Sequence, residues 1–376
     1  MNAETLLWAS AAITAYAYVG YPLLLIALRP VFARPVQKAD VLPSVSVVIP
    51  IHNEAAVIAA KIENALRLDY PERLIDVAVL SDGSTDGSAE VATRAAVRLG
   101  AAARVRVVEH AVNRGKVAVI NDIVPTLAGE ILVFTDATAM FATNAIRSLV
   151  RSFADPRVGA VGGVYRVQRP EQAATGSQED FYWKYETFVK EQEAAMGSVL
   201  GAHGQIYAVR RALYPFPAPG TINDDYVIPL RIAQKGFRVA YDAEAVVYED
   251  AREMTGFGRR VRIMAGNVQQ LREIGGLLSP LRAGSLFGLI SHKLLRLVVP
   301  FAMLATLLAN VSLLDRDVYR LVLAVQGVFY ALALAGAAWP LTPKLLRLPY
   351  YFCMVNAAVF AGMYHALTGR RTMRWS

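Results

Sequence analysis

Cysteine is almost absent from this chain, because only Cys353 among its 376 residues is a cysteine. A single thiol excludes a disulfide within the chain and any metal site built from several thiolates. This composition fits a domain that faces the reducing cytoplasm. The chain also lacks internal repeats and low-complexity tracts.

A dense basic stripe is missing as well, although the formal net charge is +8. Proteins that bind nucleic acid carry lysine and arginine clustered on one face, often between aromatic side chains. Here the basic residues instead flank long apolar segments. We therefore expect no nucleic acid partner, and we expect contact with membrane lipids.

Charged residues are absent from four segments, each long enough to cross a hydrocarbon core of about 30 Å as a helix. These segments are Thr5–Leu28, Leu297–Leu314, Leu321–Pro343 and Leu348–Gly369. We predict a transmembrane helix within residues 1–30, a linker over 31–43 and about three transmembrane helices over 297–369. The first segment follows an acid and precedes no clear cleavage site, so we interpret it as a retained anchor and not a signal peptide.

The flanking charges predict the topology. Basic residues follow the first span and precede the second, so the positive-inside rule places the central domain in the cytoplasm of an integral protein of the cell inner membrane. Four spans would leave the basic tail 370–376 outside. This conflict suggests that one C-terminal segment is interfacial or re-entrant. Residues 276–296 also suit a helix lying in the membrane interface.

The central part, residues 44–275, carries most of the charge and alternates strand and helix patterns. Buried-strand runs are expected at 44–50, 76–80, 105–109 and 131–134, with strand-like segments at 158–167 and 239–248. Helical patterns lie between the first four runs. Units of this length predict an α/β domain with a doubly wound sheet.

Acidic residues follow the strands of this domain. Asp82 and Asp136 end two strands, and Asp224 and Asp225 lie further along the chain. Acids at strand ends of such a sheet converge on the crevice in which these sheets bind ligands. Several carboxylates in one crevice are costly unless a cation or a proton is shared. The pattern predicts an enzyme that holds a metal-bound diphosphate.

Six segments in order resemble glycosyltransferase family 2, in its membrane-embedded branch with cellulose, chitin and hyaluronan synthases. The resemblance implies a GT-A-like doubly wound mixed sheet, with a Rossmann-like nucleotide-binding half, flanked by transmembrane helices. It also implies a metal-dependent inverting hexosyltransferase. The enzyme would move a sugar from a nucleotide-sugar, expected to be a UDP-sugar, to a saccharide or lipid-linked acceptor in polysaccharide or glycan synthesis. The segments are Pro50–Glu54, Ser81–Asp86, Asn113–Lys116, Thr135–Ala137, Asn223–Asp225 and Arg259–Arg262.

The resemblance assigns a group of residues to the donor. It implies that strand-end residues hold the nucleotide, that a lysine faces the diphosphate and that two arginines neutralise the leaving group. Local alternatives remain open, namely a turn with a helix cap at 81–87, an ordinary helix start at 113–116 and lipid contacts for the arginines. The assigned residues are Pro50, His52, Glu54, Asp82, Lys116, Asp136, Arg259 and Arg262.

The resemblance also implies a metal and a base. Asp136 matches the first acid of an Asp-x-Asp motif that holds Mg²⁺ or Mn²⁺, but Thr138 replaces the second acid, and a hydroxyl is a much weaker ligand. Asp225 matches the general base that takes a proton from the acceptor hydroxyl. Alternatively, Asp224 or Asp225 caps the helix that follows.

Acceptor contacts are expected from Gly204, Asp224 and Trp183, whereas His203 is expected to be structural. The family's Gln-x-x-Arg-Trp pattern has Arg259 and Ile263 in place of glutamine and tryptophan, which puts long-chain processivity in doubt. Two other functions stay open. One is transfer of a single sugar to a polyprenyl phosphate, and the other is a catalytically silent membrane scaffold.

Overall fold

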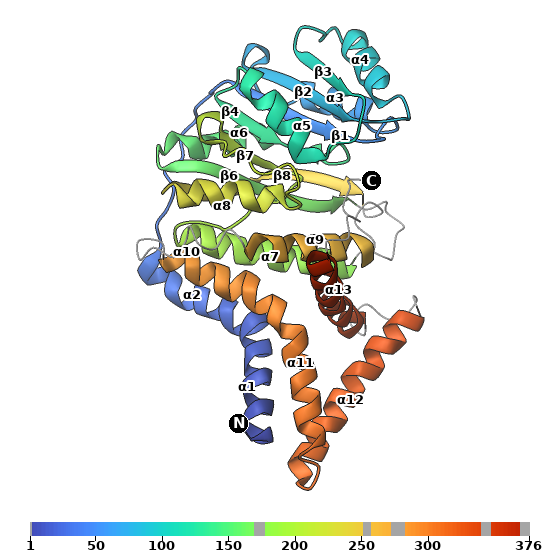
Figure 1. The fold of residues 1–376 in the computed structure, drawn as a ribbon. Coiled ribbons are helices and arrows are strands. Elements are labelled where there is room, and N and C mark those ends of the chain that lie inside the picture. Colours follow the sequence, from blue (N-terminus) through green and yellow to red (C-terminus); the bar gives the residue numbers. More distant parts are fainter. Residues whose placement is uncertain (1, 169–176, 251–256, 272–282, 340–346, 369–376) are drawn as a thin grey trace.

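The computed structural model describes residues 2–168, 177–250, 257–271, 283–339 and 347–368. The predicted basic tail 370–376 and the start of the predicted interfacial helix, 276–282, lie outside these residues. An α/β part occupies one end of the molecule, and helices of membrane type extend from the other end (Figure 1).

Eight strands form one mixed sheet in the order β3-β2-β1-β4-β7-β6-β8-β5. The first four strands in this order are parallel, β7 is antiparallel to both β4 and β6, β8 is parallel to β6, and β5 is antiparallel to β8. The strands are β1 (Val45–Ile51), β2 (Ile75–Asp82), β3 (Val105–His110), β4 (Ile131–Phe134), β5 (Met140–Phe141), β6 (Val158–Gln168), β7 (Tyr207–Arg210) and β8 (Arg238–Asp250).

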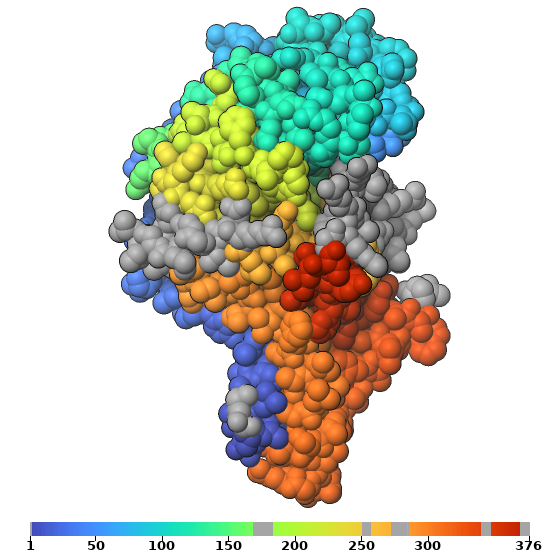
Figure 2. Space-filling model, viewed as in Figure 1, coloured from blue at the N-terminus to red at the C-terminus, as the bar shows by residue number. Residues whose placement is uncertain are grey.

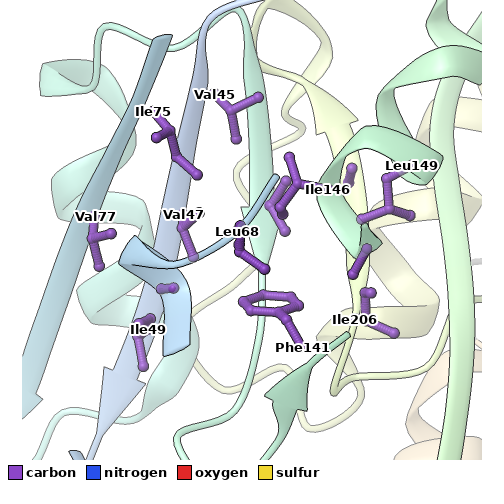
Figure 3. Close-up of a cluster of buried hydrophobic side chains, with 14 of the residues drawn as sticks. Val45, Val47, Ile49, Leu68, Ile75, Val77, Phe141, Ile146, Leu149 and Ile206 are labelled. Carbon is purple, nitrogen blue, oxygen red and sulfur yellow. The ribbon is translucent and has the colours of Figure 1, made fainter. Parts of the chain in front are cut away.

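Helices cover both faces of this sheet, and this explains why the central strands β1 and β4 are buried along their whole length. Val45, Val47 and Ile49 of β1 lie on one face with side chains of α6 (Figure 3). Residues of α3 and α4 belong to the same cluster. Val48 packs on the other face with α5 and α8. Because alternate side chains of a strand point to opposite faces, a strand buried on both sides reads as a continuous apolar run. The helices are α3 (Ile58–Leu66), α4 (Ser88–Arg98), α5 (Lys116–Ile123), α6 (Ala145–Val150), α7 (Ser177–Ala195), α8 (Asp224–Gln234) and α9 (Phe257–Gln269).

Among the described residues, three helical stretches are long and apolar enough to cross a membrane: Ala3–Phe32, Leu286–Val311 and Asp317–Ala338. The space-filling view shows the apolar helices as a narrower stalk below the broad α/β part (Figure 2). The stretches consist of α1 (Ala3–Ala15), η1 (Tyr16–Gly20), α2 (Tyr21–Phe32), α10 (Ala283–Gly288), η9 (Leu289–Leu294), α11 (Leu295–Val311) and α12 (Asp317–Ala338).

The fourth apolar segment forms α13 (Leu348–Thr368), which is not one of these three stretches. This helix packs along α9 of the α/β part, and the guanidinium of Arg260 lies 4.6 Å from the ring centre of Tyr351. The helix expected in the membrane interface continues from α10 through η9 into α11 without a loop. The predicted domain boundaries therefore remain predictions.

Candidate active site

A cavity of about 1020 Å³ lies between the α/β part and the membrane-type helices. The predicted site residues that line it are Lys116, Asp136, Trp183, Gly204, Asp224, Asp225, Arg259 and Arg262. They come from α5, the loop after β4, α7, the loop before β7, α8 and α9. Of the other predicted donor residues, Pro50, His52, Glu54 and Asp82 do not belong to the described lining of this cavity.

Asp82 lies outside the described lining of the cavity but is bonded to two residues that line it. Its two carboxylate oxygens accept hydrogen bonds from the backbone N–H groups of Arg114 (2.7 Å) and Gly115 (2.8 Å), and the residue is fully buried. A ring nitrogen of His52 lies 2.8 Å from the carbonyl oxygen of Asp82. Asp82 thus holds the loop that leads to Lys116, and its predicted contact with a nucleotide base stays a prediction.

The neighbouring Asn53–Glu54 segment is tied to the start of α4. The backbone N–H of Glu54 donates to the Ser88 hydroxyl (2.8 Å), and that of Ala55 donates to Asp86 (2.9 Å). Asn53 adopts a left-handed backbone (φ 57°). These contacts hold 53–57 as a loop, and this is why α3 begins only at Ile58.

Lys116 joins two of the predicted acids at the centre of the cavity. Its ammonium lies 3.2 Å from a carboxylate oxygen of Asp136 and 3.3 Å from one of Asp224. Burial lowers the pKa of Lys116, but the carboxylates of Asp136, Asp224 and Asp225 outweigh burial and raise it above its ordinary value. The lysine therefore stays charged.

Asp136, the predicted metal ligand, lines the cavity. Asp136 keeps 30% of its side chain exposed, whereas the Thr138 hydroxyl is engaged by Glu249. No group of three or more histidine, cysteine or acidic residues among the described residues forms a ready metal cage. A single exposed carboxylate fits Mg²⁺ or Mn²⁺ that takes its other ligands from a diphosphate and water.

Asp224 and Asp225 are the first two residues of α8, but their side chains have different neighbours. Asp224 is buried and accepts a hydrogen bond from the Tyr207 hydroxyl (2.7 Å). Asp225 faces the cavity beside Gly204. Burial, followed by the charge of Asp224, raises the pKa of Asp225 to about 6. A carboxylate with a pKa near neutrality can hold and release a proton under physiological conditions.

Arg259 and Arg262 line the cavity from α9. They are three residues apart and so share a face of the helix. Burial and the neighbouring Arg259 lower the pKa of Arg262, and Asp136 and Asp224 oppose this. Arg260, in contrast, packs on α13.

The opposite wall contains Trp183, His203 and Gly204. Trp183 meets the rings of Tyr165 and His203 edge-on, with centroids 5.2 and 5.4 Å away. A ring nitrogen of His203 lies 3.1 Å from the Tyr241 hydroxyl. Burial and the charge of Lys190 hold the pKa of His203 well below its ordinary value, so this histidine is neutral. These contacts make His203 part of the wall.

Sequence reasoning missed the other end of the cavity. Tyr18, Lys190, Lys293 and Arg296 line it from η1, α7, η9 and α11. The one available signal was that Lys293 and Arg296 interrupt an apolar helix three residues apart. No pattern in the sequence linked them to α7 or to Asp225.

Comparisons with known proteins identify the family. A family model described as "Glycosyltransferase like family 2" matches residues 43–268. A Beta-monoglucosyldiacylglycerol synthase of Nostoc sp. is 28% identical over 241 residues, covering 60% of this chain and 49% of its own length. A Poly-beta-1,6-N-acetyl-D-glucosamine synthase of Staphylococcus epidermidis is 21% identical over 233 residues, covering 60% of this chain and 55% of its own. This chain thus spans about half the length of the curated relatives it matches.

A solved structure resembles nearly the whole chain. It is the mannosyltransferase PcManGT from Pyrobaculum calidifontis in complex with GDP-Man and Mn²⁺, with a TM-score of 0.78 and 26% identity. The match covers 97% of this chain and all of that one. The mixed sheet is therefore the GT-A fold that the sequence predicted.

Proposed function

We propose that this chain, which belongs to glycosyltransferase family 2, is a membrane-bound inverting enzyme that moves a sugar from a nucleotide-sugar to a hydroxyl acceptor. The observation that carries the proposal is the arrangement of one cavity. Asp225 with a pKa of about 6 faces it together with Lys116, Arg259 and Arg262. The cations suit a diphosphate, and the acid suits proton transfer.

In the proposed reaction the acceptor oxygen attacks the anomeric carbon of the donor sugar. The bond from that carbon to the diphosphate oxygen breaks, and Asp225 takes the acceptor proton. Lys116 and Arg262 stabilise the negative charge that develops on the departing nucleoside diphosphate. A bound Mg²⁺ or Mn²⁺ would supply further positive charge to the diphosphate, with Asp136 as its protein ligand.

Support for the donor comes from the relatives. The similar mannosyltransferase structure contains GDP-Man and Mn²⁺. We therefore consider a GDP-sugar as a second candidate donor, in addition to the UDP-sugar expected from the sequence. The named relatives make a glycolipid and a polysaccharide, and both kinds of acceptor fit the proposal.

The proposed location is the cell inner membrane, with the α/β part in the cytoplasm. Basic residues after the first candidate span and before the second support this orientation. If the three candidate spans all cross, α13 lies on the same side as the α/β part, and this agrees with its packing on α9. Three spans thus also remove the conflict with a basic tail on the outside.

The test is Asp225→Asn, which keeps the shape of the side chain but cannot accept a proton as a carboxylate does. We expect sugar transfer to fall by about 10²-fold or more, measured with UDP- and GDP-sugars and Mn²⁺ in detergent. Binding of UDP or GDP should persist. Asp69→Asn is the matched control, because Asp69 is an exposed acid outside the described lining of the cavity. This variant should keep normal sugar transfer. Normal turnover by the Asp225 variant would remove this residue from the role of base, and no metal-enhanced nucleotide binding by the native protein would favour a silent scaffold.

A further inference from the structure

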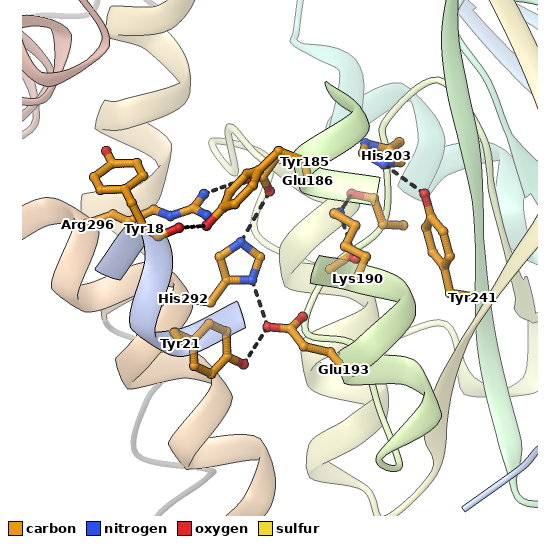
Figure 4. A network of polar contacts seen from close by, with 12 residues as sticks. Tyr18, Tyr21, Tyr185, Glu186, Lys190, Glu193, His203, Tyr241, His292 and Arg296 are labelled. Carbon is orange, nitrogen blue, oxygen red and sulfur yellow. Dashed lines mark hydrogen bonds and ion pairs between the residues drawn. The ribbon is translucent and has the colours of Figure 1, made fainter. Parts of the chain in front are cut away.

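Lys190 is a buried lysine of α7 that the proposed reaction does not use. It lines the cavity, and only 5% of the residue is exposed. On its helix it lies between Glu186 and Glu193, which share its face (Figure 4). Burying an ammonium is costly unless its N–H donors and its charge are engaged. Its contacts therefore indicate what this lysine does.

The ammonium of Lys190 holds the loop before β7. It donates to the carbonyl oxygens of Gly201 (3.0 Å) and Ala202 (2.7 Å). The backbone N–H of Ala202 in turn donates to the carbonyl oxygen of Asp225 (2.8 Å). Lys190 is thus connected to the first turn of α8 through a single residue of this loop.

The same loop forms the wall beside the carboxylate of Asp225. A Cβ atom on Gly201 would lie 2.7 Å from the ring of Tyr226, so the loop packs closely on α8. A Cβ atom on Gly204 would lie 3.5 Å from a carboxylate oxygen of Asp225. A shift of this loop would therefore change the surroundings of the proposed base.

The two acids that flank this lysine on α7 have partners on the membrane-type helices (Figure 4). Glu186 accepts a hydrogen bond from Arg296 and lies 3.2 Å from one ring nitrogen of His292. Glu193 accepts from the Tyr21 hydroxyl (2.8 Å) and lies 2.7 Å from the other ring nitrogen of His292. The close contacts of the acids thus go to the first two candidate spans, whereas those of the lysine go to the loop before β7.

The charge of Lys190 also acts on Asp225. Burial, followed by the charge of Asp224, raises the pKa of Asp225 to about 6. Three cations oppose this rise, and Lys190 has the largest effect, followed by Lys116 and Lys293. A positive charge near a carboxylate favours its ionised form. Without Lys190, the pKa of Asp225 would therefore be higher.

Lys190 keeps its charge in the pH range that matters for this effect. Burial, followed by the charge of Lys293, lowers the pKa of Lys190 to about 8, and the charges of Glu186, Asp225 and Glu193 oppose the lowering. Asp225 takes up its proton near pH 6, which is below this value. Lys190 is therefore charged while Asp225 titrates.

We propose that Lys190 is a positioning residue for sugar transfer, whose ammonium holds the loop Gly201–Gly204 on the start of α8 and places a positive charge near the carboxylate of Asp225. This assignment rests on the proposed transferase function and adds a residue that acts through the base. It requires no contact between Lys190 and the substrate. The lysine would keep Asp225 ready to accept a proton at neutral pH.

The test is the pH dependence of nucleotide-sugar hydrolysis by Lys190→Met, with the full chain in detergent. Removing the positive charge should raise the pKa of Asp225 by about one unit. The rate at pH 6 should then be about a tenth of the rate at pH 8, compared with about half in the native protein. Lys184→Met should keep the native profile, because Lys184 is an exposed lysine of the same helix outside the described lining of the cavity.

Two further variants separate the charge from the hydrogen bonds. Lys190→Gln has an amide that can donate to the loop but carries no charge, so its acidic limb should move upward as in Lys190→Met. Lys190→Arg keeps the charge and should retain the native limb. An unchanged limb in Lys190→Met or Lys190→Gln would overturn the assignment, and so would an equal upward shift in Lys190→Arg. If Lys190→Met no longer binds nucleotide, Lys190→Gln decides, and loss of binding in both would show a role in folding alone.

Binding of GDP or UDP with Mn²⁺ and the Asp225→Asn variant separate this inference from the proposed function. A native profile in Lys190→Met, together with an inactive Asp225→Asn, would refute only the role of Lys190. Normal turnover by Asp225→Asn, or no nucleotide binding by the native protein, would refute the proposed function, whatever the Lys190 variants show.

Discussion

The pH dependence of turnover offers the sharpest test of how the cavity works. The pKa of Asp225 is raised from 3.8 to about 6 by burial and by the charge of Asp224. A base must be deprotonated to act, so activity should be lost as the pH falls through about 6. For a single ionisation the rate at pH 5 should then be about a tenth of the rate at pH 8.

Asp224→Asn removes one cause of this shift. An amide oxygen can still accept the hydrogen bond of Tyr207, so the local geometry should persist. A like charge at close range typically raises a pKa by about one unit. The acidic limb of the variant should therefore lie about one unit lower, and its rate at pH 5 should rise to about half of its rate at pH 8.

The assay is hydrolysis of a nucleotide-sugar with water as the acceptor, followed between pH 4.5 and 8.5. Water also has to lose a proton, and its use avoids any effect of Asp224 on a larger acceptor. The Asp69→Asn variant should reproduce the native profile. A native profile that is flat down to pH 5, or an acidic limb that moves upward in Asp224→Asn, would refute this account of Asp225.

Two further predictions concern the walls of the cavity. Lys116→Met should weaken binding of UDP or GDP with Mn²⁺ by about tenfold or more, since it removes a charged donor beside the predicted diphosphate site; titration calorimetry measures this, and an unchanged Kd would contradict that placement. Gly201→Ala should lower the midpoint of thermal unfolding more than Gly197→Ala does. Both glycines have a positive φ (145° and 144°), but an added Cβ would lie 2.7 Å from Tyr226 at the first position and meet nothing within 4 Å at the second. Equal effects would show that backbone strain alone matters.

Much of the fold was predictable because its signals are local. The strand predicted at 131–134 is β4, and the runs at 44–50 and 105–109 match β1 and β3 within one residue at each end. Their apolar residues face helices on both sides, so the pattern was strong. The short β5 and the antiparallel β7 lacked such a pattern, and they were not predicted as strands.

The site was predicted in part. Asp136 and Asp225 were expected in one crevice, and both line the same cavity. Asp82 was expected there too, but its oxygens are taken by backbone N–H groups of the loop before Lys116. An aspartate at a strand end gives the same sequence pattern whether its carboxylate binds a ligand or accepts hydrogen bonds from the backbone. The sequence therefore could not distinguish a ligand-binding Asp82 from a structural one.

The sequence by itself determined the class of fold, the apolar helices and the order of the polar segments, because each depends on neighbouring residues or on matching patterns. Only the tertiary structure decided which side chains share a cavity. Lys190 and Lys293 are 103 positions apart by their numbers and lie in different helices, yet both face the space beside Asp225. The reason is that contacts between distant segments depend on how helices pack on the sheet and on one another, and no local pattern encodes that packing.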